Sequence, residues 1–184
     1  MRANSLLTDI DRVLFSAQDI SDVITELGLK ITRDYAGRRP LLVSVLRGGL
    51  IFLADLMRGI DLPLSIDFMA VSAYGPAVAS GVVQVLKDLD ELITGRDVIV
   101  VEDIIDTGLT LNYLLQILKA REPASLEVCT LLDKSVRRIA NIHIAYKGFD
   151  IPDLFVVGFG LDLEQRYRNL PFIGVLKEEL LVSS

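Results

Sequence analysis

Residues 98–118 read VIVVEDIIDTGLTLNYLLQIL and contain the clearest fold signal of the chain. Residues 98–101 form a short run of β-branched apolar side chains, which is typical of a strand buried on both faces. The apolar stripe of one helix face follows at Leu111, Leu114, Leu115 and Leu118. A buried strand that leads into an amphipathic helix is the repeating unit of a parallel α/β sheet.

The flanking segments repeat this alternation. Residues 17–35 carry apolar side chains at helical spacing, residues 41–46 read as a strand, and a second helical pattern follows the turn Arg47-Gly48-Gly49. Residues 65–71, 82–87 and 126–132 read as further strands, and residues 72–81 as a mobile loop rich in small residues. We therefore expect a mostly parallel, twisted α/β sheet flanked by helices, with ligands at the carboxyl ends of its strands. The chain from about Lys134 is less regular and is expected to form a smaller lobe.

Composition excludes several classes of protein. At 184 residues and 51% hydrophobic residues, the chain is long and apolar enough for one domain with a sizeable core. A net charge of -6 argues against a broad basic face for nucleic acid. No apolar stretch is long enough to cross a bilayer, the first fifteen residues do not resemble a secretory signal, and Cys129 is the only cysteine. We expect a cytoplasmic protein with neither a nucleic-acid nor a membrane partner.

Residues 102–110 carry the chemistry. Thr107, Gly108 and Thr110 stand at the start of the expected helix, where free N–H groups, a glycine and two hydroxyls suit a phosphate monoester. Glu102 and Asp103 would repel a bare phosphate, but they fit sugar hydroxyls or a Mg²⁺ ion. A sugar phosphate meets both requirements.

Residues 100–110 resemble the 5-phosphoribosyl-1-pyrophosphate signature of the type I phosphoribosyltransferases, most closely their hypoxanthine-guanine branch. Leu46-Arg47-Gly48-Gly49 is similar to the family's pyrophosphate loop, residues 72–81 to its flap, and residues 131–134 and 151–171 to its base-binding segments. The resemblance implies one phosphoribosyltransferase domain over residues 1–184, with a hood formed by the C-terminal part and N-terminal residues. It also implies a Mg²⁺ cofactor, a homodimer or homotetramer, and purine salvage. In that reaction the phosphoribosyl group passes from 5-phosphoribosyl-1-pyrophosphate to hypoxanthine and guanine, giving IMP or GMP and pyrophosphate.

The resemblance also implies roles at the donor. Glu102 and Asp103 would hold the ribose hydroxyls, and both would take part in Mg²⁺ binding together with Asp162. Pyrophosphate would be bound by Arg47, Gly48 and Arg168. The loop around the 5-phosphate would consist of Asp106, Thr107, Gly108, Leu109 and Thr110.

Further implied roles concern the base and the flap. Asp106 would act as the catalytic base that takes the proton from N7 of the purine. Lys134 would read O6 of a 6-oxopurine. The remaining purine-binding residues would be Phe155, Val156 and Asp162, and the flap residues Ser72 and Tyr74 would close over the reaction centre and exclude water.

Simpler alternatives stay open for individual residues. Asp106 or Thr107 could merely cap the helix, Arg47 could be a solvated turn residue, and Phe155 could pack in the core. A different function is also open, namely a nucleotide-sensing regulator that keeps the phosphoribosyltransferase fold without catalysis, although such a regulator would be expected to carry a basic patch or an added DNA-binding module. A sugar-phosphate enzyme of other chemistry is the third possibility.

Overall fold

A six-stranded sheet forms the centre of the computed structural model, which describes residues 6–72 and 84–181. Its strand order is β4-β3-β2-β5-β6-β7. Neighbouring strands are parallel except at one edge, where β4 pairs antiparallel with β3. The strands are β2 (Leu41–Leu46), β3 (Ser65–Ser72), β4 (Gln84–Lys87), β5 (Asp97–Ile105), β6 (Ser125–Asp133) and β7 (Tyr146–Asp150). The predicted mostly parallel α/β sheet is confirmed.

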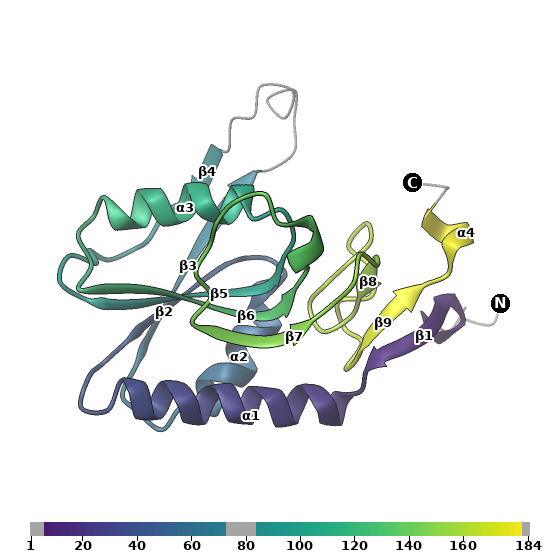
Figure 1. Cartoon of the computed structure of the whole chain (residues 1–184), viewed down its shortest axis with the longest axis horizontal. Coiled ribbons are helices and arrows are strands. Elements are labelled where there is room, and N and C mark those ends of the chain that lie inside the picture. The colour runs from purple at the N-terminus through teal and green to yellow at the C-terminus, as the bar shows by residue number, and fades with distance from the viewer. Residues whose placement is uncertain (1–5, 73–83, 182–184) are drawn as a thin grey trace.

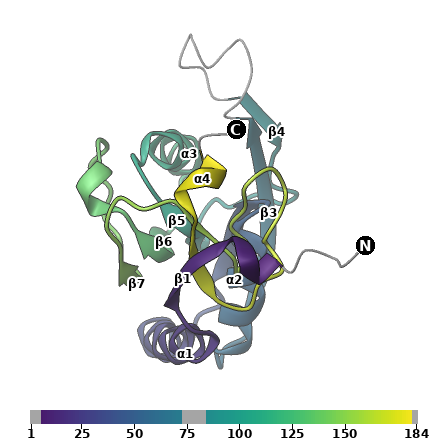
Figure 2. The ribbon, with the colours of Figure 1, turned by 90° about the vertical axis from the view of Figure 1, so that its right-hand side faces the viewer.

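Helices cover both faces of this sheet. Helices α1 (Ala17–Asp34) and α2 (Gly49–Arg58) lie on one face, and α3 (Leu109–Lys119) lies on the other (Figures 1 and 2). A capping box begins α1, because Asp19 N–H donates to Ser16 Oγ while Ser16 N–H donates to Asp19 Oδ2. No helix in the described parts of the chain is both long and apolar enough to cross a membrane.

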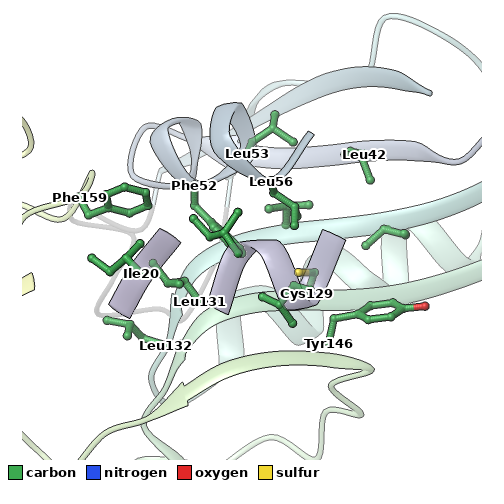
Figure 3. Packing of buried hydrophobic residues seen from close by; sticks show 14 of the residues in the cluster. Ile20, Leu42, Phe52, Leu53, Leu56, Cys129, Leu131, Leu132, Tyr146 and Phe159 are labelled. Atoms are coloured by element: carbon green, nitrogen blue, oxygen red, sulfur yellow. The ribbon is translucent and has the colours of Figure 1, made fainter. Parts of the chain in front are cut away.

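Two hydrophobic layers hold the helices against the sheet. On the α1/α2 side, Phe52, Leu53 and Leu56 pack against Leu42 and Leu131 (Figure 3). The second layer, on the α3 side, includes Leu111, Leu114, Leu118, Val98, Val100 and Val128. Successive residues of β5 alternate between the layers, as expected for a strand with a helix layer on each face. Each fully buried leucine side chain contributes about 1.5–3 kcal/mol.

A second, three-stranded sheet, which we call the hood, stands at one end of the main sheet (Figure 1). Its order is β1-β9-β8, and both pairings are antiparallel. The hood strands are β1 (Ile10–Phe15), β8 (Val156–Val157) and β9 (Ile173–Leu176). Short helical turns η1 (Leu6–Asp9), η3 (Ser135–Arg137) and α4 (Glu178–Leu181) complete the described structure. The hood therefore joins residues from both ends of the sequence.

Strand β5 differs from its predicted length. The apolar run suggests a strand over residues 98–101, but β5 continues through Glu102 and Asp103 to Ile105. The parallel ladder to β6 extends the pairing past the apolar run, since Glu102 is registered with Thr130 and Ile105 with Asp133. Both carboxylates therefore stand on a strand and not in a loop.

Candidate active site

The carboxyl ends of three parallel strands converge on one edge of the sheet. Arg47 and Gly48 follow β2, Asp106 follows β5, and Lys134 follows β6. Two adjoining cavities open there, and Ile104 lines both of them. The larger, of about 360 Å³, is lined by Arg47, Gly48, Asp103, Ile104, Lys134, Phe155, Val156, Leu161, Asp162 and Arg168. The smaller, of about 240 Å³, is lined by Val45, Glu102, Ile104, Ile105, Asp106, Thr107, Gly108, Thr110 and Leu111.

The two adjacent carboxylates of β5 face different cavities. Successive side chains of a strand point to opposite sides, so Glu102 lines the smaller cavity and Asp103 the larger one. Burial raises the pKa of Glu102 well above its ordinary value, and the charge of Asp103 adds to this. Burial likewise raises the pKa of Asp103 to about 6, although the Ile104 N–H and the Arg168 charge oppose the rise. A cation or hydroxyl donors would relieve the unfavourable ionisation of this pair.

The loop between β5 and α3 has an open anion-binding end. Gly108 occupies the N-cap position of α3 with a φ of 78° and, as a glycine, has no side chain that could cap the helix. A Cβ at Gly108 would also lie 2.8 Å from Ile142 Cδ1. Thr107 Oγ1 is 3.5 Å from Leu109 N, at the outer limit of a hydrogen bond, and Asp106 Oδ1 accepts none. Thr107 therefore makes one long capping contact with the helix, so the capping alternative holds in part for Thr107, whereas no described contact supports it for Asp106.

The turn after β2 lies directly against the Asp103 carboxylate, so a side chain at Gly48 would have to displace it. A Cβ there would overlap Asp103 Oδ2, and a Cβ at Gly160 would overlap the Gly48 carbonyl. The peptide bond between Leu46 and Arg47 is cis. The Arg47 side chain is exposed, and its Nη1 donates to Gln165 Oε1 at 2.9 Å, a contact that links this part of the cavity lining to the turn at Gln165.

Asp162 and Arg168 form an ion pair at the opposite wall of the larger cavity. Arg168 Nη2 lies 2.7 Å from Asp162 Oδ1, and the Gln165 N–H donates to Asp162 Oδ2 at 2.8 Å. Arg168 Nε is buried and has no hydrogen-bond partner among the described residues. Gln165 thus touches Arg47, Asp162 and Arg168, yet the sequence gives no signal for it because it stands in a turn with a φ of 66°.

The rest of the larger cavity combines a buried ammonium with an exposed ring. Lys134 is 7% exposed, and its Nζ lies 3.8 Å from Asp153 Oδ1. Phe155 is 41% exposed, so the core-packing alternative for this ring is wrong. Val156 is buried and paired with Val175 in the hood. Leu161 also lines the cavity and was not predicted from the sequence.

Of the predicted site residues whose side chains the structure describes, only Leu109 is not brought into these cavities. Leu109 lines neither cavity, and its side chain is exposed at the start of α3. Ser72 ends β3 opposite Gln84, and nothing is described for its side chain. Tyr74 lies outside the described residues. Of the predicted flap region, the structure therefore describes only the two flanking strands, β3 and β4.

A larger cavity does not carry the same chemistry. It has a volume of about 720 Å³, shares Phe155 with the site, and is lined by Asp11, Arg12, Asp153, Leu154, Phe155, Val175, Leu176, Lys177, Glu178 and Glu179. It contains neither the N-terminus of α3 nor the carboxylates of Glu102 and Asp103, whose pKa values are raised, so we assign the site from convergent polar groups and not from volume.

The acidic residues fit a metal that arrives with its substrate. Within residues 6–72 and 84–181, no three His, Cys, Asp or Glu side chains cluster closely enough to hold a metal ion by themselves. Glu102 and Asp103 nevertheless offer two carboxylates whose ionisation is unfavourable without a counter-charge. Mg²⁺ commonly binds through one or two carboxylates together with waters and substrate phosphates. The residues present fit that mode of binding.

Comparisons with known proteins agree over almost the whole chain. Residues 14–164 match the phosphoribosyl transferase domain. The hypoxanthine-guanine phosphoribosyltransferase of Streptococcus thermophilus is 51% identical over 173 residues, which cover 94% of this chain and 96% of that protein. The protein of the same name from Bacillus subtilis is 50% identical over 92% of this chain and 94% of its own length. The crystal structure of a hypoxanthine phosphoribosyltransferase from Staphylococcus aureus superimposes with a TM-score of 0.91 at 46% identity, covering 97% of this chain and 99% of that one.

Proposed function

The chain belongs to the phosphoribosyl transferase family, and from this premise we propose that it transfers the 5-phosphoribosyl group of 5-phosphoribosyl-1-pyrophosphate to hypoxanthine and guanine. The products are IMP or GMP and pyrophosphate, so the reaction serves purine salvage. The observation that carries the proposal is the pair of cavities that have Ile104 as a common lining residue. One contains the N-terminus of α3, which suits a phosphate, and the other contains an exposed aromatic ring and a buried ammonium.

The smaller cavity binds the ribose 5-phosphate in this proposal. The N–H groups of residues 107–110 and the hydroxyls of Thr107 and Thr110 donate to the phosphate oxygens. Glu102 accepts hydrogen bonds from the ribose hydroxyls from one side and Asp103 from the other. Both carboxylates become easier to ionise when such donors are present.

Pyrophosphate leaves from the larger cavity. The tight turn at Gly48 brings backbone N–H groups to it, while Arg47 and Arg168 provide positive charge. Mg²⁺, when bound, offsets the negative charge of the departing pyrophosphate. Glu102, Asp103 and Asp162 are the residues that would hold it, directly or through water.

The base lies between Phe155 and the donor. Phe155 stacks on the purine ring, the Val156 backbone pairs with the edge of the base, and Asp162 borders the same pocket. Lys134 donates to O6, which favours 6-oxopurines over adenine because a single donor cannot satisfy an amino group. Asp106 accepts the proton from N7 as the new bond to the sugar forms.

The wider context completes the proposal. Residues 1–184 act as one transferase domain whose hood presents Phe155 and Val156, and the flap with Ser72 and Tyr74 closes over the reaction centre to exclude water. The enzyme works in the cytoplasm as a homodimer or homotetramer. It needs no nucleic-acid or membrane partner.

A substrate panel tests the proposed function directly. Purified protein with 5-phosphoribosyl-1-pyrophosphate and MgCl₂ is offered hypoxanthine, guanine, xanthine, adenine and uracil separately, and nucleotide and pyrophosphate formation are followed. We expect turnover of hypoxanthine and guanine, its loss when EDTA is added in excess, and its recovery with further MgCl₂. Tight binding of the donor without turnover of any base would refute catalysis and favour the nucleotide-sensing regulator.

A further inference from the structure

Arg137 joins two side chains that have separate roles at the purine. It ends the short turn η3, three residues after Lys134. Its Nε lies 3.2 Å from Asp106 Oδ1, and its Nη1 donates to Asp153 Oδ1 at 3.5 Å. Asp153 Oδ1 in turn lies 3.8 Å from Lys134 Nζ. Four charged side chains of alternating sign therefore form one chain from Asp106 to Lys134.

The two ends of this chain act on neighbouring atoms of the base. In the proposed function, Asp106 takes the proton from N7 and Lys134 donates to O6, and these atoms lie on the same edge of a 6-oxopurine. The two side chains follow different strands, β5 and β6. The distance between Asp106 and Lys134 must match one rigid ligand. The contact between Arg137 and Asp153 connects these two side chains. A planar guanidinium suits this task because it loses less freedom for each contact than a lysine does.

The side chains in these contacts are exposed, which indicates that the contacts matter more for the site than for the stability of the fold. The side chains of Asp106, Arg137 and Asp153 are 42%, 46% and 58% exposed. Ion pairs so open to water add little to the stability of a fold.

The neighbouring arginine offers an internal contrast. Arg138 is only 15% exposed, pairs with the buried Asp133, and donates to the carbonyls of Ile105 and Asp106. Its contacts hold the backbone of the loop together, whereas Arg137 contacts the reactive side chain.

The contact between Asp106 and Arg137 is electrostatic. Asp106 Oδ1 is buried and lies 3.2 Å from Arg137 Nε, yet it accepts no hydrogen bond of acceptable geometry from any described group. The contact thus orients the carboxylate through charge and does not use Oδ1 as a hydrogen-bond acceptor.

We infer that Arg137 is a positioning residue that, through Asp106 and Asp153, sets the spacing between the proton acceptor for N7 and the donor to O6. This inference rests on the proposed function. Arg137 touches neither reacting atom, so its removal should weaken the use of the base and leave binding of the phosphoribosyl donor unchanged.

The test compares Arg137→Gln, Arg137→Lys, Asp153→Asn and the double variant Arg137→Gln/Asp153→Asn. Arg33→Gln is the matched control, because Arg33 also pairs with an aspartate but lies on α1 away from both cavities. Steady-state kinetics give kcat and the KM of each substrate, and thermal unfolding reports stability. We expect Arg137→Gln to lower kcat/KM for hypoxanthine on the order of 10-fold, a fraction of what a 1 Å misplacement can cause. The donor KM and the unfolding temperature should stay at wild-type values.

Two further results complete the expectation. Arg137→Lys should recover part of the loss because it keeps the charge, and the double variant should be no worse than Arg137→Gln because both changes break the same contact. The inference would be overturned if Arg137→Gln had wild-type kinetics, or if its loss of activity were explained by a lowered unfolding temperature. It would also be overturned if the losses in kcat/KM of the two single variants added up in the double variant. The absence of turnover in the wild-type protein would instead refute the proposed function, and the inference with it.

Discussion

Replacing Asp103 with asparagine should stabilise the unliganded protein while it lowers activity. Burial is the main reason that the pKa of Asp103 rises from 3.8 to about 6. Between these pH values the carboxyl group is ionised in the unfolded chain but still protonated in the folded one. Stability therefore falls as the pH rises through this window, and above about pH 6 the folded state carries the full penalty.

The size of the effect follows from the same two pKa values. Their difference, at about 1.4 kcal/mol per pH unit, corresponds to about 3 kcal/mol at pH 7.5 and about 1 kcal/mol at pH 4.5. This is an upper estimate, because Asp103 is half-buried and water reaches part of it. For a chain of this length, about 3 kcal/mol raises the unfolding temperature by roughly 6–12 °C. Asparagine keeps an oxygen that can accept the Ile104 N–H, as Asp103 Oδ1 does now.

Urea unfolding in EDTA, without substrates and at one protein concentration, measures the difference. Asp61→Asn serves as control, since Asp61 is an exposed carboxylate in the connection between α2 and β3. We expect Asp103→Asn to be more stable than wild type at pH 7.5, with a smaller gain at pH 4.5, and Asp61→Asn to match wild type at both. If Asp103→Asn were no more stable at pH 7.5 with an unchanged m-value, the carboxylate would not be destabilising the fold, and the reasoning would be refuted.

Three further substitutions test the site. Asp106→Asn should lower kcat by roughly 10²–10³-fold and leave the donor KM nearly unchanged, because it removes the proton acceptor; a wild-type kcat would rule out that role. Lys134→Gln should raise the KM for hypoxanthine about 10-fold without a matching change for the donor, and equal changes for both substrates would argue against a contact with O6. Gly48→Ala should raise the donor KM at least about 10-fold, since its Cβ would overlap Asp103 Oδ2; unaltered donor kinetics would show that the turn adjusts freely.

Local patterns predicted the main sheet and its helices well. Helix α1 ends one residue before the predicted limit, with Tyr35 as its C-cap, and begins at the predicted Ala17 behind the capping box. Strand β2 has the predicted bounds. These elements are specified by side chains a few residues apart, which a single sequence displays directly.

The hood and several site contacts could not be predicted in this way. Strand β8 is two residues long, and β1 pairs with a strand more than 150 residues away, so neither has a local pattern that identifies its partner. Gln165 and Arg137 likewise take their places through contacts with distant residues. The motif residues were predicted because of the family resemblance. Gln165 and Arg137 are not among the residues to which the resemblance gave a role.

The pairing of β1 with β9 also determines the order in which parts of the enzyme can fold during synthesis. Every strand of the six-stranded sheet has left the ribosome before β9 emerges, and a chain under synthesis can fold such a unit early. Strand β1, made first, must wait for residues 173–176 before it finds its neighbour. The purine pocket, which depends on the hood for Val156, is therefore completed last, so a nascent chain acquires its core before it can recognise a base.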